Sequence, residues 1–294
     1  MKARLRIALI GCGRVGIAIG FGLKRAGHRI VSVRDTNQSA ERRARRLLLP
    51  RSAGPRPLTS DPHSSTPDLL LIATPDSQIA RAYHALKPAL IPGQTVVHFS
   101  GALTSRVFGN ASQRRVAALS MHPVMTFAGR KPVNSFNGVY FTLEGKPKAV
   151  ALGRQLVKSL GGRALLIRAA DKPLFHAACV FVSNLLDVAI DAGVESCLRL
   201  GIKPRNAFDV LEPLIRQTLS NIHDLGTAQA LTGPIERGDI ATIRRHVAAL
   251  RRRSPELLPL YAALSQGALR LARRKDSVSP AELRALRTAV SLPE

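Results

Sequence analysis

Three polar residues lie at helical spacing in an apolar segment of the C-terminal half, and their side chains are suited to proton transfer. Lys172, His176 and Asn184 are at i, i+4 and i+12, so one helix would carry them on roughly one face. A hydride added to a C=O or C=N carbon leaves charge on the oxygen or nitrogen, which a cation or an acid must compensate. We predict that Lys172 polarises the acceptor or binds a carboxylate and that His176 supplies the proton. Asn184 and its neighbour Ser183 would orient the substrate. The alternative for His176 is a histidine that is hydrogen-bonded in the core, and the alternative for Lys172 is a solvated residue that caps the helix.

Two further segments hold candidate residues for the same chemistry. His122-Pro123 follows an apolar strand-like run, and a histidine, with an unperturbed pKa of about 6.5, exchanges protons at neutral pH. The alternative is that this pair only ends the strand. Thr232 and Arg237 are candidate substrate-binding residues, since an arginine can hold an anion through two parallel hydrogen bonds while Asp239 caps the next helix. An Arg237–Asp239 ion pair that shapes the turn is the alternative.

A glycine motif near the N-terminus predicts a phosphate-binding loop. Gly11-Cys12-Gly13-Arg14-Val15-Gly16 is a GxGxxG sequence between a strand-like run and a helix-like run. Gly11 allows the tight turn, Gly13 lets the backbone approach a pyrophosphate, and Gly16 lets the helix pack close to the strand. Apart from Cys12, all of these residues are predicted to bind a dinucleotide cofactor.

The end of the second predicted strand indicates which dinucleotide this would be. Arg34 and Asp35 lie 18 and 19 residues beyond the last glycine of the motif. An acid at this place binds the adenosine ribose of NAD, whereas an arginine accommodates the 2′-phosphate of NADP. We favour NADP over NAD, because Arg34 comes first and Thr36 with Arg42 or Arg43 could add phosphate donors. The alternative is that Arg34 merely pairs with Asp35.

The elements that must position these residues follow from hydrophobic periodicity. We expect strands at 5–10, 29–33, 69–73, 95–99, 116–120, 139–143 and 164–167, helices at 15–26, 39–49 and 77–90, and a Pro/Ser-rich connection at 50–67. Further helices are expected at about 173–200, 204–223, 235 or 239–252, 256–274 and 280–291. The pattern predicts an α/β doubly wound Rossmann sheet in residues 1–169 and an all-helical domain in residues 170–294. Thr74-Pro75 and Ser100-Gly101 would lie at the carboxyl edge of that sheet, beside the nicotinamide or as ordinary turns.

Composition excludes several classes of protein. The 294 residues include 44 Lys+Arg against 19 Asp+Glu, a net charge of +25, but few aromatic residues lie among the basic clusters, so we do not expect a nucleic-acid partner. Three separated cysteines predict neither disulfides nor a metal site. Polar residues interrupt the apolar stretch 177–194, which is expected to be a buried helix and not a membrane span. With no targeting signal recognised, we expect a cytoplasmic protein.

Five segments together resemble a known family. They are Gly11-Cys12-Gly13-Arg14-Val15-Gly16, His98-Phe99-Ser100-Gly101-Ala102-Leu103, Met121-His122-Pro123-Val124-Met125-Thr126-Phe127, Phe175-His176-Ala177-Ala178 through Ser183-Asn184, and Leu231-Thr232-Gly233-Pro234-Ile235-Glu236-Arg237-Gly238-Asp239. They are similar to bacterial oxidoreductases that join a Rossmann-like domain to a domain of unknown function, relatives of pyrroline-5-carboxylate reductase, ketopantoate reductase and 6-phosphogluconate dehydrogenase.

The resemblance implies an NADP-binding domain, a helical domain that often forms a homodimer, and no particular substrate. A similar His-Pro turn carries a catalytic histidine in prephenate dehydrogenases. Related 3-hydroxyacid dehydrogenases have Asn four residues after their helix lysine, where this chain has His176. Together with the residues, this predicts an NADP(H)-dependent oxidoreductase acting on a small, carboxylate-bearing C=O or C=N substrate. The alternative is a non-catalytic NADP-binding sensor or scaffold that acts through its helical domain.

Overall fold

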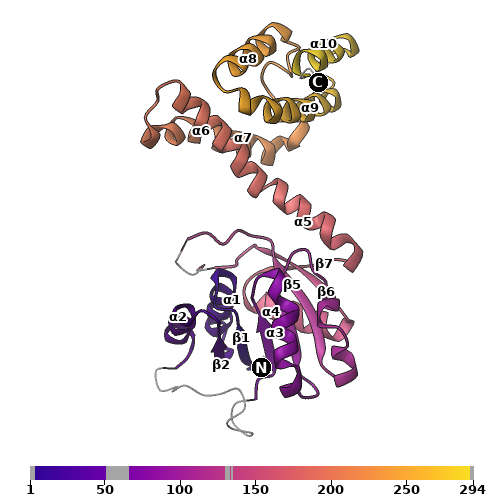
Figure 1. Cartoon of the computed structure of the whole chain (residues 1–294). Helices are drawn as coiled ribbons and strands as arrows, with labels where there is room; N and C mark the ends of the chain where they lie inside the picture. Colours follow the sequence, from indigo (N-terminus) through magenta and orange to yellow (C-terminus); the bar gives the residue numbers. More distant parts are fainter. Residues whose placement is uncertain (1–3, 51–65, 130–132, 134, 292–294) are drawn as a thin grey trace. The chain divides into compact units, whose positions relative to one another are not determined.

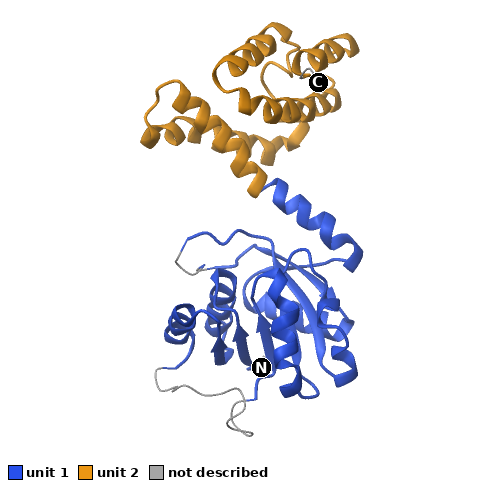
Figure 2. Ribbon diagram, in the orientation of Figure 1, with its two compact units in different colours: residues 1–183 blue, residues 184–294 orange. Residues whose placement is uncertain are grey.

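The structure is a computed structural model that describes residues 4–50, 66–129, 133 and 135–291 (Figure 1). It divides into two compact units, residues 1–183 and 184–294, which are described separately (Figure 2). Most of the predicted connection 50–67 lies outside the described residues.

The first unit is built around a seven-stranded sheet in the order β2-β1-β3-β4-β5-β6-β7. The strands are β1 Arg6–Ile10, β2 Arg29–Arg34, β3 Leu69–Ile72, β4 Thr95–His98, β5 Ala117–Pro123, β6 Tyr140–Gly145 and β7 Arg163–Leu166. The first five strands are mutually parallel, β6 is antiparallel to β5, and β7 is parallel to β6. This sheet, followed by a helical region, confirms the predicted fold class.

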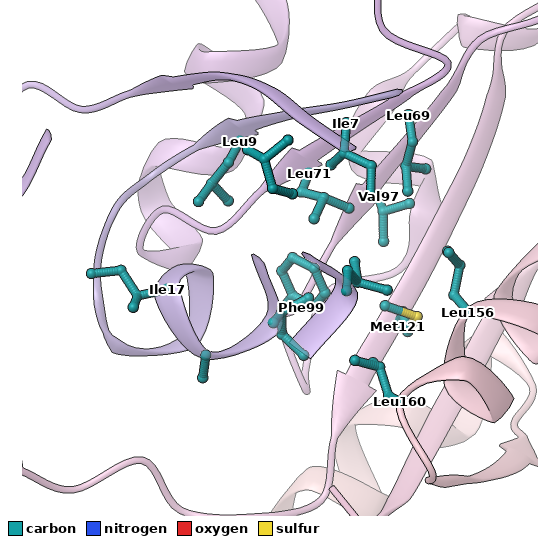
Figure 3. Packing of buried hydrophobic residues seen from close by; sticks show 14 of the residues in the cluster. Ile7, Leu9, Ile17, Leu69, Leu71, Val97, Phe99, Met121, Leu156 and Leu160 are labelled. Atoms are coloured by element: carbon teal, nitrogen blue, oxygen red, sulfur yellow. The ribbon is translucent and has the colours of Figure 1, made fainter. Parts of the chain in front are cut away.

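Four helices cover the two faces of the sheet and enclose separate hydrophobic cores. They are α1 Arg14–Arg25, α2 Gln38–Leu48, α3 Asp76–Leu86 and α4 Pro147–Ser159, and α5 Lys172–Phe181 follows the last strand. One core joins alternate strand residues such as Leu9 and Leu71 to α1, α2 and Leu156 of α4 (Figure 3). The other joins the opposite strand faces to Tyr83 of α3 and to Phe108. Burial on both faces explains why β3 is an unbroken apolar run.

Two features of this sheet differ from the predictions. Helix α4 is not among the predicted helices, although Pro147 at its start and a buried stripe that includes Val150 and Leu156 are regular helix signals. Strand β5 continues to Pro123, so His122 lies inside the strand and does not follow it. The reason is the antiparallel pairing of β5 with β6, which extends beyond the last parallel pair, His98 with Ser120.

The predicted helix 173–200 is wrong as a single element. The chain forms α5, an interruption at Val182 and Ser183, and then α6 Asn184–Arg199. Asn184 therefore begins a helix of the second unit, whereas Lys172 and His176 lie in the first. The expectation of a buried helix is also wrong, because Phe181 is 68% exposed and Val182 is 73% exposed in the single chain.

The described residues of the second unit form helices joined by short connections and contain no strand. It contains α6, α7 Pro204–Gln229, α8 Ile240–Arg253, α9 Leu258–Lys275 and α10 Pro280–Val290. Gly226 breaks the regular backbone of α7 with φ of 76°. Ile243, Leu269 and Leu286 form the centre of a small core between α8, α9 and α10. The predicted domain boundary lies between residues 169 and 170, whereas the compact units divide between residues 183 and 184. Helix α5 belongs to the first unit because Lys172, at its start, is hydrogen-bonded to Ser120 of β5.

Candidate functional site

The glycine loop between β1 and α1 has the geometry that its sequence predicts. Gly11 has a φ of +91°, and a Cβ atom there would lie 2.5 Å from the backbone carbon of Ala73. A Cβ at Gly16 would collide with the carbonyl oxygen of Gly11, so the helix can approach the strand only without one. Gly13 is different, because nothing lies within 4 Å of the place where its Cβ would be. The open side of Gly13 is therefore where a ligand can reach the backbone.

These differences predict that one alanine substitution lowers stability and that another weakens binding. Gly11→Ala should destabilise the first unit by about 1–3 kcal/mol, because it combines a left-handed φ with a backbone clash. Gly13→Ala should leave the unfolding midpoint nearly unchanged but weaken dinucleotide binding, because its methyl group fills the open side. Chemical denaturation and fluorescence titration measure the two effects. Equal loss of stability in both variants would contradict this account of the loop.

A cavity of about 700 Å³ opens where the carboxyl ends of β1, β2 and β3 meet. Its lining comprises Ile10, Gly11, Gly13, Arg34, Asp35, Thr36, Ala73, Thr74, Pro75, Gln78, Arg81, Ala82, Ala85 and Leu86. The chain crosses from one side of β1 to the other here, which is where doubly wound sheets bind ligands. Five predicted cofactor residues thus line one cavity. The first turn of α1 follows the cavity lining and comprises Arg14, Val15 and Gly16. This turn has no acidic residue that would repel a phosphate group.

The rim of this cavity beyond β2 is organised by carboxylates that bind backbone groups. Asp35 accepts hydrogen bonds from the N–H groups of Cys12, at 2.6 Å, and Asn37, at 2.7 Å. Glu41 accepts one from the N–H of Asp35, and its Oε1 lies 3.5 Å from Arg34. The carboxylate of Asp35 therefore binds the glycine loop to the end of β2. Arg34 remains in the cavity lining, with its side chain 39% exposed.

The start of α1 beside the cavity fits a dinucleotide phosphate, and one neighbouring arginine has an unpaired donor. The helix N-terminus behind Gly13 has no side-chain cap, so its first N–H groups face the opening without a competing acceptor from that residue. On α2, the Nε of Arg43 is buried and has no hydrogen-bond partner among the described residues, although Arg43 is not one of the residues that line the cavity. A buried donor of this kind needs an acceptor, and a phosphate group is one that an arginine binds well.

A second cluster lies at the ends of β4 and β5, centred on a buried lysine. Lys172, at the start of α5, is only 1% exposed. Its Nζ donates to the hydroxyl of Ser120 at 2.9 Å and to the carbonyl oxygen of Ser100 at 3.3 Å. Burial lowers the pKa of Lys172, and the negative charges of Glu144 and Asp76 oppose that effect. Lys172 thus joins α5 to two neighbouring strand ends.

Ser100 links this cluster to the cofactor cavity. Its hydroxyl donates to Asp76 at 2.6 Å and accepts hydrogen bonds from the N–H groups of Ala102 and Leu103. Asp76 directly follows the Thr74-Pro75 turn that lines the cavity. The two predicted carboxyl-edge turns therefore share one hydrogen-bonded connection.

Two histidines meet over Gly101, the residue that follows Ser100. The rings of His122 and His176 have centroids 6.0 Å apart and are nearly perpendicular. A Cβ at Gly101 would clash with the ring of His176 and lie 3.0 Å from Nε2 of His122. Burial lowers the pKa of His122 to about 4, and the charge of Lys172 acts in the same direction. His122 is therefore a neutral imidazole at neutral pH, and both rings are half-buried.

Several residues of the cluster were not predicted as site residues. His98 is completely buried, and its Nδ1 lies 3.2 Å from the backbone nitrogen of Ser100. Burial lowers the pKa of His98 to about 4. Glu144, on β6, accepts hydrogen bonds from the N–H and hydroxyl of Ser105. His98 ends β4, and Ser120 is its partner in the last parallel pair with β5, so both lie at the carboxyl edge where their strand positions could have identified them.

The remaining candidates do not belong to this cluster as the structure describes it. Ser183 donates its hydroxyl to the carbonyl of Cys179, one turn earlier in α5. Asn184 begins α6, and Thr232 lines a separate cavity of about 370 Å³ in the second unit. Asp239 caps α8 through the N–H of Thr242, as predicted.

Arg237 is exposed and lies in the turn before α8. Hydrogen bonds from Thr242 lower the pKa of Asp239, and the charge of Arg237 is the smallest of the influences in that direction. Its predicted contact with substrate therefore stays a prediction. Among the described residues, no group of three or more His, Cys, Asp or Glu side chains could hold a metal ion.

Family models cover most of the chain in two parts. Residues 1–123 match the Rossmann-like domain, and residues 139–268 match a domain of unknown function, DUF2520. The second match begins at the antiparallel strand β6 and continues into α9. No curated protein matches the sequence.

Solved structures share the fold over nearly the whole chain. A provisionally assigned NADP oxidoreductase from Bacteroides fragilis is 23% identical, with a TM-score of 0.70 over 90% of this chain and 98% of that one. A protein from Thermotoga maritima is 18% identical, with a TM-score of 0.71 over 92% and 99%. An imine reductase from Aspergillus terreus, solved with NADPH4 and a dibenzazepine, is 16% identical, with a TM-score of 0.59 over 96% and 99%. At these identities the likeness shows the fold.

Proposed function

We propose that this chain, which combines a Rossmann-like domain with a DUF2520 domain, is an NADP(H)-dependent oxidoreductase. Its substrate would be a small molecule with a C=O or C=N group, or the reduced form of one, that carries a carboxylate. The observation that carries this proposal is the single connection from the glycine-loop cavity through Asp76 and Ser100 to the buried Lys172. Such a connection sets a dinucleotide and ionisable groups side by side.

The cofactor preference rests on the rim of the cavity. Arg34 and Thr36 line it, and Arg43 on the neighbouring helix has a buried donor that needs an acceptor. Asp35, the acid that would otherwise bind a ribose, is occupied by the N–H groups of Cys12 and Asn37. A 2′-phosphate therefore suits this rim better than a ribose with two free hydroxyls. The Aspergillus terreus imine reductase, of the same fold, was solved with a reduced NADP cofactor.

The side chains near Gly101 would compensate the charge that hydride transfer creates on the substrate. The nicotinamide, when bound, supplies or accepts the hydride. His122 and His176 are the half-buried groups that can hold or release a proton beside it. Lys172 holds the backbone of Ser100 and the hydroxyl of Ser120 in place behind them. Arg237 and Thr232 stay as proposed contacts for the substrate carboxylate.

We also propose a cytoplasmic homodimer. The stretch 169–199 is long and apolar enough to cross a membrane by length and composition, but Lys172 within it is bound to the sheet of the first unit. Large apolar side chains are exposed on its helices and on α7, including Leu174, Phe181, Val188, Val210, Leu214 and Leu225. Exposed apolar side chains in this number favour a protein interface. Light scattering should therefore give about twice the chain mass of 31.7 kDa.

The test of the proposed function is turnover. NADPH consumption is followed by absorbance with a panel of 2-oxo acids and cyclic imines, in the wild-type protein and in His122→Gln and His176→Gln. We expect turnover with at least one compound and a loss of about 100-fold or more in each variant. His223→Gln, an exposed histidine of α7, is the matched control.

The alternative is a non-catalytic NADP-binding sensor or scaffold. It predicts tight NADPH binding with no turnover of any compound, and binding that neither histidine substitution changes. Turnover that is abolished by the histidine substitutions but kept in the control would exclude it.

A further inference from the structure

The turn 231–235 forms one wall of a cavity of about 370 Å³ in the second unit. Helix α8 contributes Ile243 and His246, which are at i and i+3. Helix α9 contributes Tyr261, Leu264, Ser265 and Ala268, which are at i, i+3, i+4 and i+7. Each helix therefore presents one face to the cavity. The volume is within the range of small-molecule sites, about 300–1,000 Å³.

The turn that forms this wall is held by charged side chains that are not among the lining residues. Lys275, at the end of α9, donates to the carbonyl oxygen of Leu231 at 2.8 Å and pairs with Glu236 at 2.9 Å. Asp239 caps α8 by accepting from the N–H of Thr242 at 2.9 Å. Because these contacts fix the turn to both helices, a ligand does not have to order the cavity when it binds.

The lining is mostly apolar, with one set of hydrogen-bonded polar groups. Among the described residues, those that line the cavity include no Asp, Glu, Lys or Arg. Nδ1 of His246 lies 3.0 Å from the hydroxyl oxygen of Tyr261, and the two rings are nearly perpendicular. Ser265, one turn later in α9, is 4% exposed and is hydrogen-bonded to Tyr261. A few polar groups in an apolar pocket are typical of sites that orient a small molecule.

The hydroxyl of Tyr261 has capacity for a further hydrogen bond. Burial raises the pKa of Tyr261, so this hydroxyl keeps its proton at neutral pH. When Tyr261 donates that proton to His246, its oxygen can still accept, and when Nδ1 of His246 carries a proton, Tyr261 can still donate. A ligand hydroxyl satisfies both arrangements, because it donates and accepts.

We propose that this cavity binds a small uncharged molecule that has an apolar ring or chain and one hydroxyl group. The hydroxyl bonds to Tyr261, and the apolar part contacts Ile243 and Ala268. A carboxylate is disfavoured, because Arg237 is not among the lining residues and an unpaired charge is costly to bury. The site shares no lining residue with the glycine-loop cavity, and it does not depend on the proposed function.

The first test uses 2-naphthol, which is apolar, is uncharged at neutral pH and has one hydroxyl. The chain has no tryptophan, so the fluorescence of the probe is measured with little background. Titration of the full-length protein should show saturable binding. Naphthalene should bind about 3- to 10-fold more weakly, since it lacks one hydrogen bond, and 2-naphthoate about tenfold more weakly or worse. Absence of saturable binding, or equal affinity for naphthalene or 2-naphthoate, would overturn the proposal.

Substitutions in α9 test whether the probe lies in this cavity. Ala268→Leu fills the cavity and should weaken 2-naphthol binding about tenfold or more, whereas Ala263→Leu, at an exposed position of the same helix, should leave it unchanged. Tyr261→Phe keeps the ring and should remove the advantage of 2-naphthol over naphthalene. Tyr140→Phe, at an exposed position of the first unit, is its control. Unchanged binding in folded Ala268→Leu would contradict the proposed site.

NMR of the protein with labelled tyrosine locates the probe even when Ala268→Leu fails to fold. The chain has three tyrosines, Tyr83, Tyr140 and Tyr261, and the two phenylalanine variants assign their resonances. 2-Naphthol should shift the resonances of Tyr261 and leave those of Tyr83 and Tyr140 in place. Shifts confined to Tyr83 or Tyr140 would overturn the proposal. None of these measurements uses a nucleotide, so their failure is distinct from failure of the proposed function.

Discussion

Replacing Arg34 with alanine should lower the affinity for NADPH about 10- to 100-fold and leave the affinity for NADH within about twofold. The guanidinium lines the cavity at the end of β2, where a 2′-phosphate would lie. Hydrogen bonds to charged groups contribute about 1.5–3 kcal/mol each, and 1.4 kcal/mol corresponds to a factor of ten. NADH has no phosphate at that position and gains nothing from the arginine. Fluorescence titration of both nucleotides measures the two affinities.

Arg34 also lies 3.5 Å from Glu41, so the variant needs a control for charge and for local structure. Arg46→Ala removes a positive charge from the exposed side of α2 and should change neither affinity. Glu41→Gln keeps the arginine and removes the negative charge that Arg34 and Arg45 share, and it should preserve the preference for NADPH. A parallel loss of NADPH and NADH affinity in Arg34→Ala would contradict a phosphate-binding role, since it would indicate damage to the loop.

Gly101→Ala should reduce turnover by about 100-fold or more while NADPH still binds within about twofold of wild type. The new methyl group would clash with the His176 ring and lie 3.0 Å from Nε2 of His122, so the rings must move apart. A displacement of about 1 Å at a reacting centre can cost a factor of 100 in rate. Steady-state kinetics gives the rate, and NADPH titration gives the binding.

Gly267→Ala, in α9, is the matched control for this substitution. Its Cβ would meet only the guanidinium of Arg270, at 3.7 Å, and should change neither rate nor binding. Full activity in Gly101→Ala would show that the two histidines do not lie at the reacting centre. Loss of NADPH binding in the same variant would instead show that Gly101 supports the cofactor.

The sheet was predictable because its signals are local and consistent. Buried parallel strands such as Leu69–Ile72 are unbroken apolar runs, and GxGxxG has one structural role between a strand and a helix. Helix α4 was missed, although it carries a regular buried stripe. The break at Val182 and Ser183 could not be seen, because both flanking segments are apolar and helix-forming. Interruptions of this kind depend on tertiary packing more than on propensity.

Some residues of the candidate site were predictable from local sequence spacing, and others were not. Lys172 and His176 were found from their helical spacing, and the structure places both near His122. Asp76, Ser120 and Glu144 are ordinary residues in the sequence, and only the order of strands in the sheet brings them to Lys172. The burial of the lysine likewise depends on long-range packing. That burial is what changes its inferred role from contact to positioning.

Binding of NADPH and NADH to the purified full-length chain tests the account most directly. Calorimetry in parallel with fluorescence should show one NADPH site per chain, and NADH bound at least about tenfold more weakly. This result would assign the cavity beside the glycine loop to NADP and justify the search for a substrate. Binding of neither nucleotide would contradict the account, because the cavity, the buried donor of Arg43 and the connection through Ser100 would then serve no oxidoreductase.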